Sequence, residues 1–224
     1  MQSPSVHVLQ APAAGAASLS ERAAHAIREL IVSLELPPGS PVSERELMER
    51  LGLGRTPVRE ALRALAQEKL VEVYPRRGIV VAPVDVGDLA ALSEARLSLE
   101  SFAARCAAER ATPEDRAIAR QLLEALPALA DAGDERGLIE LDQRIHRHVY
   151  RCAHNPFIES TLNEYYVLTL RIWFLALDRV ARLDDAVAEH RELLQAICDA
   201  DADRAEAVMR RHIDGFERAI RAVL

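Results

Sequence analysis

The stretch GRTPVREALRALAQEKLV, from Gly54 to Val71, decides the fold of the first third of this chain. Thr56 can cap the start of a helix, and Pro57 suits the first helical position, where a missing N–H costs nothing. Apolar residues recur at helical spacing along one side. Arginines project from another side, so the stretch predicts a recognition helix that enters a DNA major groove. The apolar residues are Val58, Ala61, Leu62, Leu65 and Leu70, and the arginines are Arg55, Arg59 and Arg63.

Two predicted helices precede this stretch. The sequence from Ser43 to Gly54 predicts a short helix with a Ser43/Glu46 capping box, followed by a tight glycine turn. The sequence from Ser18 to Leu36 predicts an amphipathic helix, with a cap formed by Ser18 and Glu21, that ends at Pro37-Pro38-Gly39. A short helix, a tight turn and a second helix are typical of a helix–turn–helix motif.

A β-hairpin is predicted after the recognition helix, between Leu70 and Val84. Val71 and Val73 alternate with polar neighbours, the turn is Pro75-Arg76-Arg77-Gly78, and the return strand begins at Ile79. Three helices and a hairpin with a basic tip predict a winged helix–turn–helix.

The rest of the chain predicts only helices. It is rich in Ala, Leu, Arg and Glu, and the breaks between helical patterns are short, as in an antiparallel bundle. The predicted fold class is therefore mainly α, with a winged helix–turn–helix first and an all-α six-helix bundle second. The six predicted helices cover residues 86–110, 114–131, 134–152, 156–180, 182–199 and 201–223.

Composition sets limits on the class of protein. With 224 residues, half of them hydrophobic, the chain can form two modest domains. The net charge of −7 comes from the sequence after residue 82, so it does not argue against a DNA-binding first domain. The three cysteines lack metal or redox spacing, which favours a reducing cytoplasm. Neither a membrane span nor a secretion signal is predicted. The predicted domains are a disordered tail at 1–15, a DNA-binding domain at 16–84 and a helical domain at 85–224.

Four polar residues stand out in the helical domain. Asp142 and His146 lie four positions apart, so their side chains leave one face of one helix. His190 and His212 lie in the fifth and sixth predicted helices of this domain. One carboxylate and three imidazoles would suit Zn²⁺, Ni²⁺ or Mn²⁺. Only the first pair is linked by local geometry, and spacing alone favours ordinary core or surface histidines.

Residues from about 18 to 84 resemble the N-terminal domain of GntR-type bacterial transcription regulators. The resemblance implies that Arg45, Arg55 and Arg59 contact phosphates and base edges, and that Thr56 contacts a phosphate. Gly78 would approach the minor groove at the wing tip. Gly54 departs from the family, which often has Ser there. Arg63 and Arg77 are further candidates, with plain basic surface as the alternative. The matching residues are Pro38-Gly39, Glu44 to Leu47, Arg55 to Leu62 and Arg77-Gly78.

The second domain resembles the C-terminal ligand-binding domain of the FadR subfamily, called FCD. Many members hold a metal with one Asp and three His, and this implies that Asp142, His146, His190 and His212 bind a divalent cation. Ile145 departs from the family, which usually has Phe there. The matching residues are Arg96 to Glu100, Asp142 to His146 with Asn155-Pro156, Glu189 to Arg191 and Ala207 to His212.

The same resemblance implies that the effector is a small carboxylic acid. Arg96 is the first candidate to clamp its carboxylate, and Arg171 is the second, because a guanidinium matches that group. The alternative for Arg96 is an ion pair with Glu100, four residues further on. Trp173, with Tyr165 and Tyr166, is a candidate for the pocket wall, and the alternative is core packing.

Together these features predict a transcription regulator rather than an enzyme. A homodimer would place two winged domains on an inverted repeat in double-stranded DNA, and effector binding would release this DNA, as expected of a repressor. One alternative is a metal-dependent enzyme, although no H-E-x-x-H signature is present. Another is a regulator whose metal is purely structural or is itself the signal.

Overall fold

The computed structural model describes residues 18–76, 78–85, 87–131, 135–176 and 183–223. These residues form two compact units. One unit contains the described residues up to Asp85 together with Leu170–Leu175, and the other contains the rest. The tail predicted at 1–15 lies outside the described residues. No helix in the described ranges combines the length and apolar character needed to cross a membrane.

The first helix, α1, covers Leu19–Val32. Its capping box forms as predicted, because Ser18 and Glu21 each accept a hydrogen bond from the other's backbone N–H. The prediction that the helix continues to Leu36 was wrong. Leu34 has a positive φ of 60°, and the Leu36 N–H donates to the Leu30 carbonyl over 2.8 Å, which closes the helix end. Proline also disfavours the α conformation of the residue before it. Leu36 precedes Pro37, which favours a helix end before Leu36.

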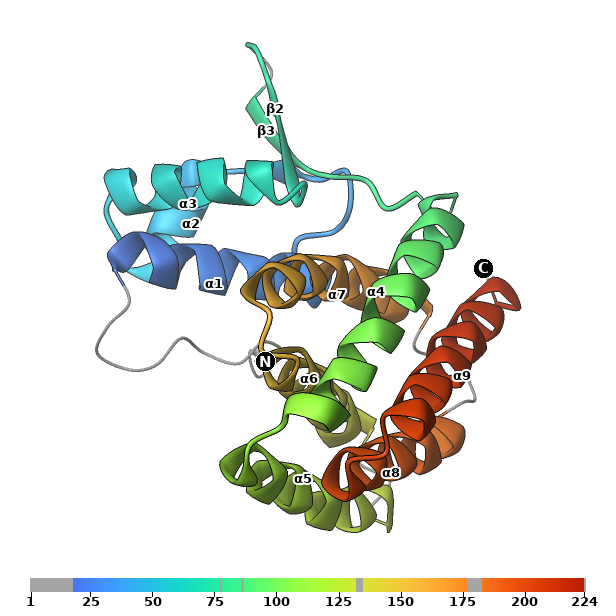
Figure 1. Cartoon of the computed structure of the whole chain (residues 1–224). Coiled ribbons are helices and arrows are strands. Elements are labelled where there is room, and N and C mark those ends of the chain that lie inside the picture. Colours follow the sequence, from blue (N-terminus) through green and yellow to red (C-terminus); the bar gives the residue numbers. More distant parts are fainter. Residues whose placement is uncertain (1–17, 77, 86, 132–134, 177–182, 224) are drawn as a thin grey trace. The chain divides into compact units, whose positions relative to one another are not determined.

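The helix–turn–helix consists of α2, Glu44–Leu51, and α3, Arg55–Gln67. Gly52 closes α2 with a left-handed φ of 64°. Ser43 accepts from the backbone N–H of Glu46, which is one half of the predicted capping box. Figure 1 shows α2 and α3 beside α1, and all three helices have buried apolar residues. The buried residues of α3 are Val58, Ala61, Leu62 and Leu65.

Three expectations about α3 were wrong, two at its start and one at its end. Gly54 occupies the N-cap position without a side-chain hydrogen bond, so Thr56 is not the cap. Pro57 is the third helical residue, a position where the backbone N–H has no partner within the helix either. At the other end, Leu70 lies beyond the helix but is still buried, since its N–H donates to the Leu65 carbonyl over 2.9 Å.

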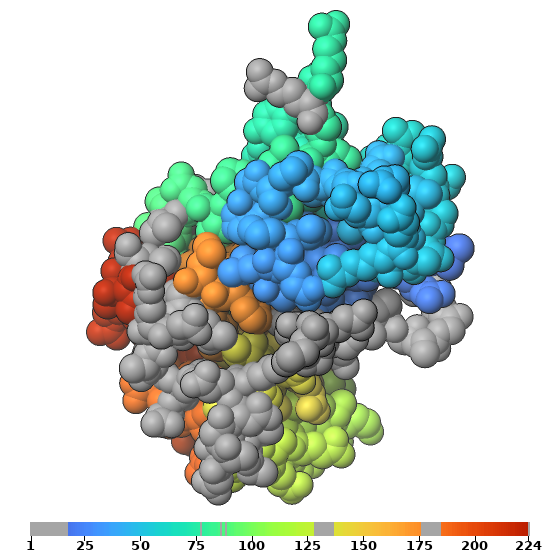
Figure 2. Space-filling view, turned by 180° about the vertical axis from the view of Figure 1, so that it is seen from behind, coloured from blue at the N-terminus to red at the C-terminus, as the bar shows by residue number. Residues whose placement is uncertain are grey.

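The wing is part of a three-stranded antiparallel sheet with the order β1-β3-β2. The predicted hairpin is present as β2, Val71–Tyr74, and β3, Gly78–Val81. The additional strand β1, Pro41–Val42, pairs with β3 and is too short to produce an alternating pattern. Val71 is buried but Val73 is 59% exposed, because the hairpin extends beyond the core. Figure 2 shows this hairpin, in teal, projecting from the rest of the N-terminal unit.

The helices after the wing follow the predicted series. Helix α4 packs against α6, α8 and α9, while α5 packs against α6 and α8 (Figure 1). Helix α8 also packs against α9. This arrangement brings one face of α4, α6, α8 and α9 into a shared interior. The helices are α4, Asp88–Arg110; α5, Pro113–Asp131; α6, Glu135–Cys152; α7, Pro156–Ala176; α8, Leu183–Asp199; and α9, Ala202–Arg221.

Candidate metal centre and nucleic-acid interface

The predicted DNA-contacting residues of α2 and α3 are exposed in the N-terminal unit. Their helices are anchored on the opposite side by buried apolar residues, of which Leu47 is 4% exposed and Leu62 is 1% exposed. The polar side chains thus lie on the surface of the unit, away from its core. The exposed residues are Arg45, Arg55, Thr56, Arg59 and Arg63.

Two of these arginines have acidic partners. The Arg59 Nε lies 3.0 Å from Glu44 Oε1, and the Arg45 Nη1 lies 3.3 Å from Glu49 Oε1. The Arg59 and Arg45 side chains are still 55% and 77% exposed, so most of each guanidinium faces solvent. A guanidinium held by its Nε keeps both Nη groups available for phosphate or guanine.

Of the two predicted wing residues, the structure describes Gly78 but not Arg77. Gly78 is exposed and has a φ of 92°, a conformation that L-amino acids with a side chain rarely adopt. Arg77 lies outside the described residues. The DNA-binding role of both residues stays a prediction.

In the C-terminal unit, Asp142, His146, His190 and His212 meet in the buried interior. Each offers one ligand atom, and these atoms all lie within 4.8 Å of one another. Helix α6 supplies the first two residues, α8 supplies His190 and α9 supplies His212. The structure therefore brings these four side chains together, while their role as metal ligands stays a prediction.

Three of the distances between the ligand atoms are close to those around a single cation. The His146 Nε2 lies 3.2 Å from the His212 Nε2 and 3.4 Å from the His190 Nε2. The His190 Nε2 lies 3.2 Å from Asp142 Oδ1. Nitrogen ligands bind Zn²⁺ at about 2.0–2.1 Å, which puts neighbouring ligands of a tetrahedral site about 3.3 Å apart. Nitrogen and oxygen ligands of this kind suit Zn²⁺, Ni²⁺ and Mn²⁺ alike, so the donor set does not select one metal.

Further polar side chains surround these four residues. The His146 Nδ1 lies 2.8 Å from Glu100 Oε2, and the His212 Nδ1 lies 3.0 Å from Glu189 Oε2. The Tyr166 hydroxyl donates to Asp142 Oδ2. Carboxylates on the outer ring nitrogen are the usual companions of metal-binding histidines.

Burial and neighbouring groups shift the pKa values of His190, His212 and Glu100 in this cluster. Burial lowers the pKa of His190 well below its usual value, and the neighbouring His212 and His146 lower it further. Burial also lowers the pKa of His212, although the hydrogen bond with Glu189 opposes this shift. Burial alone would raise the pKa of Glu100, but Arg96 and His146 outweigh it and lower this pKa to about 2. A lowered pKa keeps His190 and His212 in the neutral form, which is the form that binds a metal.

Arg96 lies next to this cluster on α4. Its side chain is 3% exposed, and its Nε donates to Glu100 Oε1 over 2.6 Å. Its guanidinium carbon also lies 5.6 Å from the centre of the Phe216 ring. The ion pair with Glu100, one of the two sequence interpretations, is therefore present. This ion pair engages the Nε of Arg96, and binding of an effector by the rest of the guanidinium stays a prediction.

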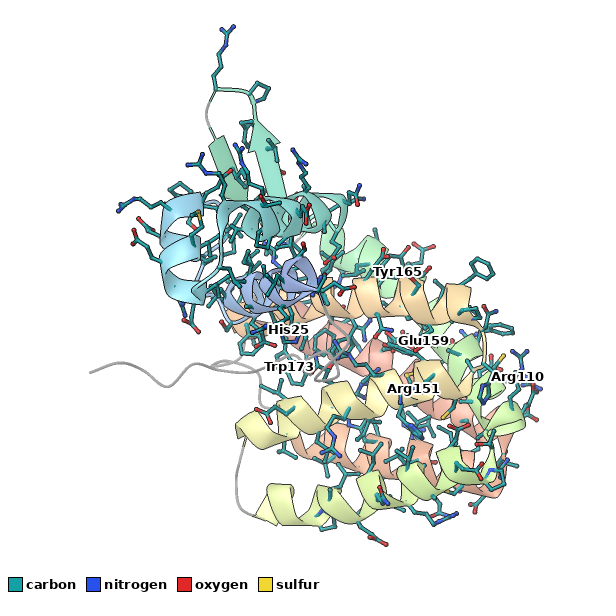
Figure 3. The ribbon with its side chains drawn as sticks, turned by 90° about the vertical axis from the view of Figure 1, so that its left-hand side faces the viewer. His25, Arg110, Arg151, Glu159, Tyr165 and Trp173 are labelled. Carbon is teal, nitrogen blue, oxygen red and sulfur yellow. The ribbon has the colours of Figure 1, made fainter. Side chains whose placement is uncertain are left out.

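The other predicted effector-binding residues are placed differently. Arg171 and Trp173 belong to the segment of α7 that groups with the N-terminal unit. Both are buried, and an Nη of Arg171 donates to the Ala82 carbonyl. Burial lowers the pKa of Arg171 to about 10. Tyr165 is half-buried on α7, where Figure 3 labels it together with Trp173. The effector-binding role of Arg171 and Trp173 stays a prediction.

Sequence reasoning did not assign a role to Glu189 and considered Glu100 only as a partner of Arg96. Glu189 precedes His190 in the chain, but it contacts His212, which lies 23 positions away. Glu100 contacts His146 across 46 positions. The only available signal was that both glutamates fall within the phrases that match the FCD domain. Spacing offered none, since each contact joins two helices.

Both parts of the chain match known protein families. A family model described as bacterial regulatory proteins, gntR family, matches residues 19–81, and a model of the FCD domain matches residues 91–215. The chain is 32% identical over 181 residues to a Paenarthrobacter nicotinovorans protein named "Probable D-xylose utilization operon transcriptional repressor". This match covers 81% of the chain and 79% of the relative. The chain is also 30% identical to the galactonate operon transcriptional repressor of Escherichia coli, and this second match covers 86% of the chain and 93% of that protein.

Solved structures share the fold. The E. coli protein McbR/YncC superposes with a TM-score of 0.82 at 23% identity, covering 92% of this chain and 98% of that one. A GntR transcriptional regulator from Rhodococcus sp. RHA1 superposes with a TM-score of 0.76 at 18% identity, covering 93% of this chain and 100% of that one. The fold class predicted from the sequence is thus confirmed.

Proposed function

The chain belongs to the GntR family of bacterial regulatory proteins and carries an FCD domain, and from that premise we propose that it is a repressor controlled by a small carboxylate. The relatives described above are named as operon repressors, which supports the direction of control. They are regulators rather than enzymes, in agreement with the sequence prediction.

The observation that carries the proposal is the meeting of four ligand side chains in the interior of the FCD domain. Asp142, His146, His190 and His212 are each less than a tenth exposed, so their burial needs a compensating interaction. A divalent cation held there would supply positive charge and open coordination positions for a carboxylate oxygen. Zn²⁺, Ni²⁺ and Mn²⁺ all suit these ligands.

Arg96 is the side chain that we assign to the rest of the effector. Its Nε is engaged by Glu100, which orients the guanidinium and leaves its Nη edge to a second carboxylate. The guanidinium is buried, so an anion beside it would be weakly screened. An acid that binds between this residue and the four ligand side chains would favour one packing of α4 against α6, α8 and α9. The free energy of this preference is what changes the affinity for DNA.

On the DNA side, we propose a homodimer that binds an inverted repeat through two copies of α3. Arg55 and Arg59 would read base edges, Arg45 and Thr56 would contact phosphates, and Arg63 would add charge. Arg77 and Gly78 would approach the minor groove at the wing. The test uses duplexes selected in vitro by the wild-type protein. Arg59→Ala should abolish sequence-specific binding in a gel-shift assay while the circular dichroism spectrum stays unchanged, and retained specific binding would contradict the assignment.

Calorimetry tests the proposal that a small acid binds at the metal and controls DNA binding. A panel of small organic acids is titrated into metal-loaded protein, into metal-stripped protein and into a His212→Ala variant. We expect binding only to the loaded wild-type protein, together with release of the selected duplex in the gel-shift assay. Equal binding to loaded and stripped protein would show that the acid does not need the metal. Metal binding without any response to acids would favour the alternative of a structural or sensed metal.

A further inference from the structure

Two histidines of the candidate metal centre contact glutamates through the ring nitrogen that faces away from the centre. The Nδ1 of His146 and the Nδ1 of His212 each lie within 3.0 Å of a glutamate oxygen. Glu100, on α4, is fully buried, and Glu189, on α8, is 7% exposed. A carboxylate oxygen without a proton accepts hydrogen bonds, so these two short contacts place the ring proton of each histidine on Nδ1. The Nε2 of each neutral imidazole then presents its lone pair to the centre.

We propose that Glu100 and Glu189 are positioning residues that hold His146 and His212 in the Nδ1–H tautomer before a metal arrives. This inference rests on the proposed metal site. Neither glutamate is a ligand in it, and each acts through a histidine. Their effect is on the orientation and protonation of the ligands, and therefore on the affinity for the metal.

The competing arrangement shows why such residues are needed. The Nε2 atoms of His146 and His212 lie only 3.2 Å apart. If one of them carried the proton, it could donate to the other, and this hydrogen bond would block the centre. That tautomer would turn an Nδ1 lone pair toward a buried carboxylate oxygen, which is unfavourable where water cannot screen the two. The glutamates thus select the tautomer that leaves the centre open.

His190 offers an internal comparison. Its Nε2 lies near Asp142 and His146, yet no carboxylate within the described ranges reaches its Nδ1. We therefore expect the tautomer of His190 to be independent of both glutamates. The two glutamates also differ from each other. Glu100 binds Arg96 in addition, whereas Glu189 lies near the half-exposed Arg211, with Glu189 Oε1 3.9 Å from the Arg211 Nε.

The first measurement needs neither a metal nor a variant. Long-range ¹H–¹⁵N correlation spectra of the metal-free protein report which ring nitrogen of each histidine carries the proton. We expect the Nδ1–H form for His146 and His212. Finding the Nε2–H form for either residue in the wild-type protein would overturn the proposal for its glutamate.

Glu189→Gln is the sharper variant, because an amide can accept from Nδ1–H or donate to a bare Nδ1. We expect His212 to become a mixture of tautomers while His146 does not change. The affinity for Zn²⁺, measured by competition with a chelator, should fall about 10- to 100-fold at unchanged stoichiometry. Zn²⁺ binding as tight as in the wild type would overturn the role of Glu189.

The matched control is Glu192→Gln. Glu192 binds Arg211 and Arg204 in the same surface network, with distances of 2.5 and 3.3 Å, and none of the histidines in the described ranges is paired with it. This variant should leave the tautomers and the Zn²⁺ affinity unchanged. An equal loss of affinity in both variants would point to a general charge effect and would contradict the positioning role.

Glu100 needs a different design, since its removal would leave the buried Arg96 without its partner. The double variant Arg96→Met with Glu100→Gln neutralises both members of the pair. It should mix the tautomers of His146 but not those of His212, and persistence of a pure Nδ1–H form would overturn the role of Glu100. A wild-type protein that binds no Zn²⁺ would contradict the proposed function, whereas the metal-free tautomers would still decide this inference.

Discussion

At the scale of single residues, opposite charges hold the proposed DNA-reading side chains in place. Glu44 accepts from the Arg59 Nε at 3.0 Å, in an exposed pair that contributes little to stability. We expect it to act on recognition instead, because it restricts the directions in which the guanidinium can present its Nη groups. A bidentate contact between arginine and guanine discriminates by about 1–3 kcal/mol only if the fork is correctly oriented.

We therefore predict opposite effects of Glu44→Gln on two kinds of DNA. Non-specific duplexes should bind somewhat more tightly, since a negative charge near the phosphates is removed. Discrimination between the selected duplex and one with a changed guanine should decrease. The measurement is the ratio of the two affinities at a fixed salt concentration. Glu49→Gln, which frees Arg45, is the control, and we expect it to change both affinities by the same factor. An unchanged ratio in Glu44→Gln would show that Glu44 does not orient Arg59.

At the scale of elements, the start of α5 depends on a reciprocal cap. The Asp115 N–H donates to the Thr112 hydroxyl over 3.1 Å, while Asp115 Oδ2 accepts from the Thr112 N–H over 2.9 Å. The His154 Nε2 lies 3.0 Å from the same carboxylate oxygen, and the His148 Nε2 lies 3.0 Å from the Asp115 carbonyl. Burial would raise the pKa of Asp115, but the hydrogen bonds from Thr112 and His154 outweigh it and lower this pKa.

This shift predicts how stability depends on pH. The folded-state pKa of Asp115 lies below the unfolded value of about 3.9, so the ionised carboxylate stabilises the fold above that value. The contribution is lost as the pH falls through the folded-state pKa. Asp115→Asn should cost about 1–2 kcal/mol at pH 7, and the difference from the wild type should disappear in acid. Urea unfolding across this range measures it, with the exposed neighbour variant Glu114→Gln as the control. A difference that stays constant with pH would contradict the explanation.

At the scale of the whole molecule, the candidate metal centre connects helices that lie far apart in the sequence. Its ligands come from α6, α8 and α9, and the surrounding carboxylates come from α4 and α8. A cation that binds only the folded state adds stability in proportion to the logarithm of its concentration, about 2.7 kcal/mol at 100 times the dissociation constant.

Removal of the metal should therefore lower the Tm of the helical domain by about 5–10 °C. Differential scanning calorimetry of protein before and after treatment with a chelator measures this change, and added Zn²⁺ should restore it. His212→Ala should be insensitive to both treatments. A wild-type Tm that does not respond to the chelator or to Zn²⁺ would argue against a metal at this site.

Local information in the sequence was sufficient for most of the secondary structure. The Ser18/Glu21 cap, the left-handed Gly52, the hairpin and the six helices after residue 85 follow from neighbours within a few positions. Errors occurred where such signals compete. Thr56 and Pro57 both favour a helix start, and yet α3 begins at Arg55, two residues earlier than a cap at Thr56 would allow.

By itself, the amino-acid order determined the helix–turn–helix with its wing and the helical second half, and it proposed the four candidate ligand residues through resemblance to a family. Only the tertiary structure decided that Glu100 and Glu189 contact His146 and His212, and that Glu44 holds Arg59. The physical reason is the range of the interactions. Caps and periodicity act within one or two turns of helix, whereas these contacts exist only after α2 has met α3 and after α4, α6, α8 and α9 have closed around one interior.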